Sequence, residues 1–194
     1  ALDMVAGRGR GNVVGFPRGS LFSYNFNGLD INGLPTFDFG RYPLGAGDYA
    51  HIAGADFLDT QYAKTYLIYH GPVEPRYTGG LSNVFNLGPW EFSFFVTMQA
   101  GNKLRLNPTF DPAFADLNVF SKRYVDRWLN PGDELRTDVP TLPSQALIDK
   151  VGRENIERAY NTYNYSQQMV ADGSFVRLKD VARVETGAKT NNII

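Results

Sequence analysis

The chain has 194 residues, a formal net charge of −1 and 43% hydrophobic residues, and it contains 14 Phe, 11 Tyr and 20 Gly. The near-neutral charge gives no reason to expect a nucleic-acid partner. The absence of cysteine excludes disulfides, thiolate metal sites and cysteine nucleophiles. No run of about 18 apolar residues is present, so a transmembrane helix is not expected. The abundant aromatic residues and glycines favour β structure with many turns.

Residues 1–70 are interpreted as a loop region that contains one β-hairpin near residues 20–39. Phe22, Tyr24 and Phe26 alternate with polar residues, which predicts a strand. Asn32-Gly33 then predicts a type I′ turn into a return strand over 36–39. Pro35 restricts that return strand to an edge or a start.

The second region, residues 71–106, shows the clearest pattern in the chain. Positions 90–101 alternate strictly: Trp90, Phe92, Phe94, Val96, Met98 and Ala100 fall on one face, and Glu91, Ser93, Thr97, Gln99 and Gly101 on the other, with Phe95 as the exception. A second strand is predicted at 78–87, with Gly88-Pro89 as a tight turn between the two. On pattern alone, a soluble hairpin packed on a core is favoured over a membrane hairpin, because alternation is a weak signal for a membrane strand.

Residues 107–172 are predicted to be an insertion of loops and short helices. One helix is expected from its cap Asp116, because Leu117, Phe120, Tyr124 and Trp128 share a face at helical spacing. A second helix is expected over 145–159 with an interruption at Gly152. Residues 137–144, which contain two prolines, are expected to be extended loop.

Period-two alternation returns in the last region, residues 173–194. Val176, Leu178, Ala182 and Val184 are assigned to one face, and Arg177, Lys179, Arg183 and Glu185 to the opposite face. The region is therefore interpreted as one strand followed by a polar tail.

No catalytic, metal-binding or cofactor-binding residue is assigned. The GRGRG segment at Gly7–Gly11 lacks the Lys-Ser or Lys-Thr of a phosphate loop and is interpreted as a mobile loop. A calcium loop beginning at Asp30 would need a glutamate where the chain has Arg41. The only histidines, His51 and His70, lack partners at metal-ligand spacing.

Enzymatic carboxylate chemistry is also poorly supported by the sequence. Asp133 and Glu134 are adjacent, but sequence neighbours point apart, and a glycosidase pair needs two carboxylates about 5–10 Å apart across a cleft. Several loop tyrosines could stack on sugars or contact a protein lid, or equally could pin the loops to one another. They are Tyr42, Tyr49, Tyr62, Tyr66, Tyr160, Tyr163 and Tyr165. No substrate-binding residue is assigned.

Four segments resemble motifs of one known family, in the family's order. They are Phe26-x-Gly28-Leu29-Asp30-x-x-Gly33-x-Pro35, then Gly71-Pro72 with Pro75-Arg76-Tyr77 and TGGLSN at 78–83, then Arg127-Trp128-x-x-Pro131-Gly132-Asp133, and finally Asp172-Gly-Ser-Phe-Val-Arg-Leu-Lys179. The family is that of the SusC/RagA-type TonB-dependent outer-membrane transporters of Bacteroidetes. Each motif is loose alone, and their common order and spacing make the resemblance.

The resemblance implies a fold class, which is all-β, with antiparallel strands from part of a transmembrane β-barrel and long extracellular loops that contain short helices. Residues 71–106 would form a barrel hairpin with a short periplasmic turn, and 173–194 a barrel strand and tail. Residues 20–70 and 107–172 would be extracellular. Phe92, Phe94, Val96 and Met98 would face lipid, Ser93, Thr97 and Gln99 the lumen, and Trp90 the interfacial aromatic girdle.

The function implied is that of part of an outer-membrane receptor that imports glycan oligomers or peptides together with a SusD-like surface lipoprotein. Family members are several times longer, so this chain is expected to be a fragment. Its expected partners are then the remainder of the barrel, and TonB through the missing N-terminal part. The expected location is the cell outer membrane. The alternatives are a soluble or surface β-rich carbohydrate-binding module and, last, a glycan-cleaving enzyme.

Overall fold

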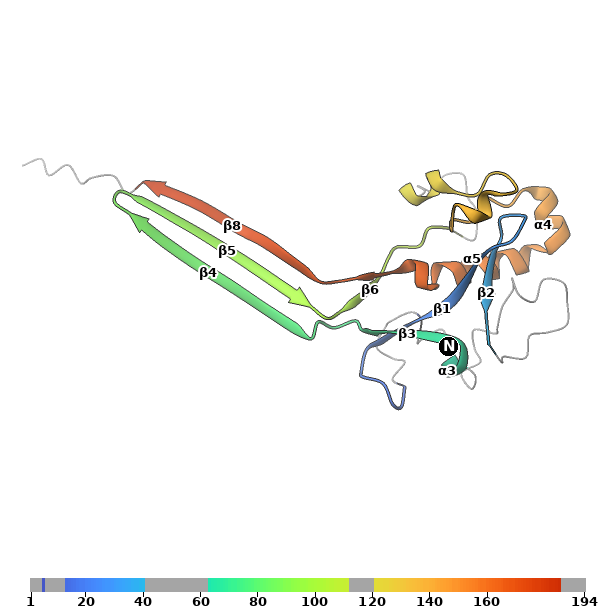
Figure 1. Cartoon of the computed structure of the whole chain (residues 1–194), viewed down its shortest axis with the longest axis horizontal. Helices are drawn as coiled ribbons and strands as arrows, with labels where there is room; N and C mark the ends of the chain where they lie inside the picture. Colours follow the sequence, from blue (N-terminus) through green and yellow to red (C-terminus); the bar gives the residue numbers. More distant parts are fainter. Residues whose placement is uncertain (1–4, 6–12, 41–62, 112–120, 186–194) are drawn as a thin grey trace, which may run out of the picture.

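The computed structural model describes Val5 and residues 13–40, 63–111 and 121–185. A long three-stranded sheet extends from a head that is built of a smaller sheet and the helices α3, α4 and α5 (Figure 1). The GRGRG segment, Arg41, His51, Tyr42, Tyr49 and Tyr62 lie outside the described residues, as do Leu117 and Phe120.

The sheet of the head has the strand order β2-β1-β3. β1 (Ser20–Leu29) pairs antiparallel with β2 (Pro35–Asp38) and with β3 (Leu67–Pro72), which follows the short helix α3 (Ala63–Tyr66). Phe22, Tyr24 and Phe26 are all buried on one face of β1. The hairpin predicted near 20–39 is therefore present.

The loop of that hairpin differs from the predicted type I′ turn. The Gly33 amide donates to the Asp30 carbonyl (2.9 Å) and the Asp30 amide to the Leu34 carbonyl (2.8 Å), which makes a three-residue loop. Gly33 has a φ of +74°, the conformation that such loops require after a type I turn. The cause is the Asp30 carboxylate, whose Oδ1 accepts the amides of Asn32 (2.9 Å) and Leu34 (2.8 Å) and closes the loop from inside.

The predicted helix over 145–159 is present, and it is divided where expected. α4 (Gln145–Val151) and α5 (Arg153–Asn164) meet at Gly152, whose φ is +92°. The 3-10 helix η3 (Gln167–Met169) follows. Within the described residues, no helix is long and apolar enough to cross a membrane.

The helix predicted to run through Tyr124 to Trp128 is wrong in its described part. The chain there forms only the five-residue 3-10 helix η1 (Lys122–Asp126), capped by Ser121, and a shorter one, η2 (Asp133–Leu135). The predicted helix is interrupted because the following loop bonds to it. The Thr137 hydroxyl donates to the Asp126 carbonyl (2.5 Å), and the Trp128 amide donates to the Val139 carbonyl (2.9 Å). Residues 137–144 are extended loop, as expected.

Aromatic side chains dominate the core of the head. Tyr160 and Tyr163 of α5 are fully buried, and the Phe110 ring packs edge-on against both, with centroid distances of 4.9 and 5.7 Å. The cluster comprises Val5, Phe22, Tyr24, Phe26, Leu34, Phe37, Phe39, Tyr66, Leu67, Phe110, Val139, Val151, Ile156, Ala159, Tyr160, Tyr163 and Met169. None of these residues comes from the long sheet.

The long sheet has the strand order β4-β5-β8. β4 (Tyr77–Leu87), β5 (Trp90–Ala100) and β8 (Phe175–Glu185) have 11 residues each and are antiparallel to their neighbours. Gly88, with a φ of +61°, makes the β4–β5 turn. The short pair β6 (Lys103–Arg105) and β7 (Val170–Asp172) joins this sheet to the head.

The prediction of a mainly antiparallel β fold with short helices in its connections is thus confirmed. The described strands lie in three separate sheets, and these sheets do not close into a barrel.

Candidate functional site

One face of the long sheet consists almost entirely of apolar side chains. Phe85 lies opposite Phe92 and Leu81 opposite Val96, while β8 places Leu178 beside Val96. We call this surface the apolar face, and its apolar members are Leu81, Phe85, Leu87, Trp90, Phe92, Phe94, Val96, Met98, Val176, Leu178 and Val181. The polar side chain of Asn83, opposite Phe94, interrupts it. The six alternate positions predicted to share a face in β5, from Trp90 to Ala100, do lie on one side of the sheet.

The apolar face is not packed against the head. Met98 is 57% exposed, Leu178 58% and Val176 75%. Ring contacts on this face are between neighbouring strands, such as Phe85 and Phe94, whose centroids are 6.0 Å apart. Soluble proteins rarely leave so large a contiguous apolar surface without a partner.

The opposite surface, which we call the mixed face, combines polar and apolar side chains. It comprises Thr78, Ser82, Val84, Asn86, Glu91, Ser93, Phe95, Thr97, Gln99, Phe175, Arg177, Asp180, Ala182 and Val184. The polar positions predicted for β5 lie here, and so does Phe95, the predicted exception. The two faces of the sheet therefore differ in polarity.

The face assignment predicted for β8 is wrong beyond Leu178. Leu178 pairs with Val96, but Asp180 pairs with Phe95, so Lys179 is an extra residue, a β-bulge. One inserted residue moves every later side chain to the other face. Val181 thus joins the apolar face, while Ala182 and Val184, which were assigned to it, lie on the mixed face. Periodicity in the sequence of a single strand carries no signal for such an insertion.

Charged and aromatic groups occupy the turn end of the apolar face. Arg183 lies opposite Phe92, and its guanidinium carbon is 3.9 Å from the centroid of the Trp90 ring. Glu185 pairs with Trp90. Trp90 lies where the β5 pattern predicts it, whereas Arg183 lies on the face opposite to its predicted one because of the bulge at Lys179.

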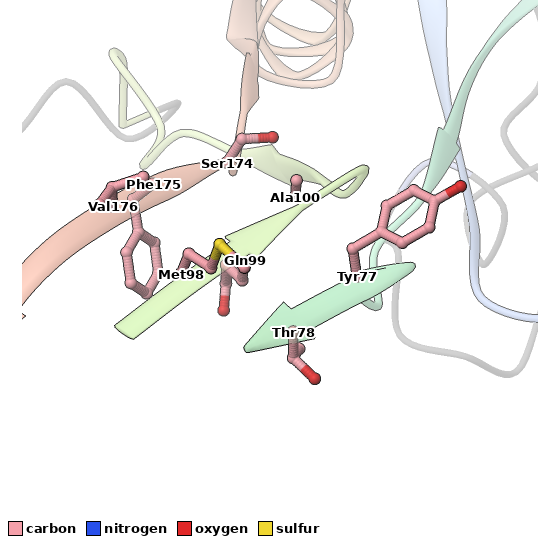
Figure 2. A pocket seen from close by; sticks show the side chains of 8 residues that line it. All are labelled: Tyr77, Thr78, Met98, Gln99, Ala100, Ser174, Phe175 and Val176. Atoms are coloured by element: carbon pink, nitrogen blue, oxygen red, sulfur yellow. The ribbon is translucent and has the colours of Figure 1, made fainter. Parts of the chain in front are cut away.

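At the other end of the sheet, the two glycines of the TGG motif make room for large β5 side chains. A Cβ on Gly79 would lie 2.8 Å from Met98 Cε, and one on Gly80 3.2 Å from the Phe95 ring. Figure 2 shows the pocket that all three strands form here, where the sheet leaves the head. Its volume is about 360 Å³, and it is lined by Tyr77, Thr78, Met98, Gln99, Ala100, Ser174, Phe175 and Val176.

The Asp172-Gly-Ser motif anchors β8 to the junction with the head. Lys103 Nζ donates to Asp172 Oδ2 (2.8 Å) and the Ser174 amide to Asp172 Oδ1 (2.7 Å). These bonds hold the pKa of Asp172 well below its usual range, and the bond from Lys103 has the largest effect. Gly173 has no room for a side chain, because its Cβ would lie 2.2 Å from Asn102 Nδ2.

The Arg-Trp-x-x-Pro-Gly-Asp motif packs directly on the β1–β2 loop. The Trp128 ring lies against Gly33, where a Cβ would be 2.5 Å from the ring. Its Nε1 donates to Glu134 Oε2 (2.9 Å), and this bond is the largest cause that lowers the pKa of Glu134. Asp133 Oδ2 accepts the amides of Leu129 (3.2 Å) and Asn130 (2.9 Å). Both carboxylates considered for acid–base chemistry thus hold their own loop together.

His70 belongs to a basic group where β1, β3 and β6 meet. Its Nε2 is 2.6 Å from the hydroxyl of the fully buried Ser23. Burial lowers the pKa of His70 below 6.5, and Arg105 and Lys103 lower it further. Arg105 donates to the Phe22 carbonyl (2.6 Å), and its own burial lowers its pKa to about 10. An imidazole beside the cations Lys103 and Arg105 does not make a cation-binding site, and within the described residues no acidic or histidine cluster could hold a metal.

The tyrosines considered for sugar stacking are mostly inside the head where they are described. Tyr66, Tyr160 and Tyr163 are buried, and Tyr165 lies under the Arg105 guanidinium at 5.3 Å. Burial raises the pKa of Tyr163 to about 12. These four side chains pin the connecting segments to one another, which was the second interpretation offered for them.

A scan against protein-family models finds no match for this chain. A search of curated proteins also finds no match. The apolar face and the contacts between the motifs are therefore the observations on which a function must be argued.

Proposed function

We propose that this chain is part of a SusC/RagA-type TonB-dependent outer-membrane receptor, and that its long sheet is a segment of the membrane barrel. The observation that carries the proposal is the exposed apolar face of β4, β5 and β8. A bilayer is a partner that such a face fits, because lipid-exposed strands present apolar residues outward and can carry polar residues inward.

The dimensions of the sheet suit a bilayer. Eleven residues per strand correspond to about 37 Å of extended chain, which spans about 26 Å when tilted by about 45°. The apolar band of an outer-membrane barrel is about 25 Å tall. The strands are thus long enough to cross it once, with the β4–β5 turn on one side and the head on the other.

The charged and aromatic groups at the turn end also support this placement. A tryptophan with a cation over its ring, as Trp90 has in Arg183, is suited to the lipid–water interface, since its body is apolar and its surroundings are polar. Gly88-Pro89 is then the short periplasmic turn, and the head projects from the opposite, extracellular side.

Both outer strands of the long sheet have an unpaired edge among the described residues, because only β5 lies between β4 and β8. Unpaired backbone groups are costly in hydrocarbon, so a spanning sheet must continue until it closes. The proposal therefore includes the remainder of the barrel as a partner, on both edges. A soluble or surface binding module, the alternative, would leave the apolar face and both edges in water.

The transport role rests on the resemblance of the four motifs to the transporter family. In the structure, two of these motifs touch through Trp128 and Gly33, and another fixes β8 beside Asn102. Motif residues that hold the fold together are what a shared architecture would preserve. The proposed activity is import of glycan oligomers or peptides across the cell outer membrane, with a SusD-like lipoprotein and TonB as partners.

A matched pair of arginine substitutions tests the membrane placement. Val96→Arg puts a charge on the apolar face near the middle of β5, and Thr97→Arg puts the same charge one residue away on the mixed face. A midplane arginine facing lipid costs about 2–4 kcal/mol. We expect Val96→Arg to reduce the amount of protein recovered in the outer-membrane fraction several-fold and Thr97→Arg to leave it nearly unchanged. Equal recovery of the two variants, or recovery of the parent protein from the soluble fraction, would refute the placement.

A further inference from the structure

Two charged side chains lie on the same side of the long sheet as the apolar face, both at the end that carries the β4–β5 turn (Figure 1). They are Arg183, which pairs with Phe92, and Glu185, which pairs with Trp90. Toward the head, the other paired residues of β4, β5 and β8 on this side include no charged residue. Charge on this side of the sheet is therefore confined to the turn end.

The Arg183 side chain is exposed and lies over the ring of Trp90, with its guanidinium carbon 3.9 Å from the ring centroid. A guanidinium in contact with an aromatic ring keeps its five N–H donors at its rim, where a fork of two donors matches the oxygens of a phosphate. Within the described part of the chain, Arg183 forms no ion pair with a carboxylate. Its geometry therefore favours an anionic group of a ligand.

Glu185 adds the opposite charge two residues further along β8. Positions i and i+2 of a strand share one face and lie about 7 Å apart. Among the described residues, Glu185 forms an ion pair neither with Arg183 nor with any other basic side chain. One cation and one anion thus stand side by side, each open to a ligand. A zwitterion that carries a phosphate and an ammonium group a few bonds apart complements both charges.

Apolar side chains continue from this charged pair toward the middle of the sheet. Val181 and Leu178 follow Arg183 on the same side of β8, and Val181 is 67% exposed. Burial of such a surface is favourable only against another apolar group. A free phosphate or a small soluble zwitterion would leave Val181 and Leu178 in water. The order of charged and then apolar side chains along β8 is that of a phospholipid, from its headgroup to its acyl chains.

We propose that the turn end of the long sheet binds a phosphatidylethanolamine molecule, with Arg183 on its phosphate and Glu185 on its ammonium group. The acyl chains then lie along Val181 and Leu178. The inference rests on the proposed membrane placement, which puts this end in the periplasmic leaflet. It adds a headgroup preference, which an apolar sheet face alone does not predict.

Native mass spectrometry measures the binding of single lipid molecules to the whole protein that contains this chain, purified from outer membranes in mild detergent. The protein is titrated with phosphatidylethanolamine and, separately, with phosphatidylglycerol of identical acyl chains. Both lipids carry the phosphate, but only phosphatidylethanolamine carries the ammonium group. We expect the parent protein to bind phosphatidylethanolamine about tenfold more tightly, the effect of one charge-assisted contact.

Three substitutions assign the binding to this site. Arg183→Gln removes the cation and should weaken the binding of both lipids about tenfold. Glu185→Gln removes the anion and should abolish the preference for phosphatidylethanolamine. Arg177→Gln is the matched control, because Arg177 also lies over a ring, that of Phe175 at 4.8 Å, but on the mixed face at the head end of β8. It should bind both lipids like the parent. Recovery of each variant in the outer-membrane fraction checks that it is folded.

Either of two results would overturn the proposal. One is equal affinity of the parent for the two lipids, and the other is equal lipid affinity of Arg183→Gln and Arg177→Gln. Both results leave the membrane placement intact, because that placement is read from the fractionation of the parent and of Val96→Arg. A parent protein recovered from the soluble fraction would refute the placement and the lipid site together.

Discussion

At the scale of single residues, glycines decide how the motifs meet. Gly33 is required twice: its φ of +74° is in the left-handed region, and the Trp128 ring occupies the space where a Cβ would lie. Gly19 has a similar φ of +68° but open space around it. Comparing substitutions at Gly33 and Gly19 therefore separates the cost of a strained backbone from the cost of a steric clash with the Trp128 ring.

We expect Gly33→Ala to lower the free energy of unfolding by about 3 kcal/mol and Gly19→Ala by about 1 kcal/mol. Both substitutions add the strain of a left-handed backbone, and only Gly33→Ala would also displace a packed ring. Urea denaturation of the full chain, followed by circular dichroism, measures both values. Similar losses for the two variants would mean that the contact between Trp128 and Gly33 contributes little.

His70 is the residue from which a pH dependence is expected. Its pKa in the folded chain lies below 6.5, chiefly through burial and then through Arg105 and Lys103. Because the unfolded chain binds the proton more readily, the stabilisation by neutral His70 is full above about pH 6.5 and is lost as the pH falls toward the lower, folded pKa. The Ser23 hydroxyl is its hydrogen-bonding partner.

The pKa can be measured by NMR in the variant His51→Gln, which leaves His70 as the only histidine. We expect its titration midpoint to lie below 6.5, and His70→Gln to reduce the loss of stability between pH 7 and pH 5. A midpoint at or above 6.5 would show that His70 is not shielded from water in the way described.

At the scale of elements, one side chain of α5, that of Asn164, binds the backbone of the segment that follows β6, at Thr109 and Phe110. Asn164 Oδ1 accepts both of their amides, at 3.1 and 3.3 Å, and its Nδ2 donates to the Phe110 carbonyl at 2.7 Å. All three residues are buried, so water cannot readily replace these bonds.

We expect Asn164→Ala to lower the free energy of unfolding by about 2–4 kcal/mol, because it leaves buried backbone groups without partners. Asn161→Ala, one turn earlier on the exposed side of the same helix, should change it by less than about 0.5 kcal/mol. Thermal unfolding of the two variants gives the comparison. Equal melting temperatures for the two variants would indicate that the side-chain bonds of Asn164 to Thr109 and Phe110 contribute little to stability.

The elements also show which features the sequence could predict. Strict alternation in β5 and the positive-φ glycine between α4 and α5 are local signals, and the structure confirms both predictions. The bulge at Lys179 and the interrupted helix around Trp128 depend on bonds to distant chain, namely to Phe95 and Val96 of β5 and to Val139. Such tertiary bonds outweigh local periodicity. The pocket beside Trp128 is lined by residues of three separate segments, so no pattern within one stretch of sequence predicts it.

At the scale of the whole molecule, the chain divides its apolar residues between two environments. Aromatic residues of the head fill a core, whereas those of the long sheet are exposed or half-buried. We propose that the apolar face contacts a second medium, and a bilayer suits the length of the strands and the position of Trp90 at the turn end. The two ends of the sheet differ as well, with a tight turn at one and the head at the other.

Cysteine scanning is a direct test of the proposed membrane placement, since these 194 residues contain no cysteine. Single cysteines along β5 and β8 are introduced into the gene, and outer membranes of the native host are treated with a water-soluble maleimide. We expect low labelling at Phe92, Phe94, Val96 and Met98 and high labelling at Ser93, Thr97 and Gln99. In β8 the alternation should shift at Lys179, with Val176, Leu178 and Val181 protected. Equal labelling at Val96 and Thr97 would show that the apolar face of β5 is not covered by lipid.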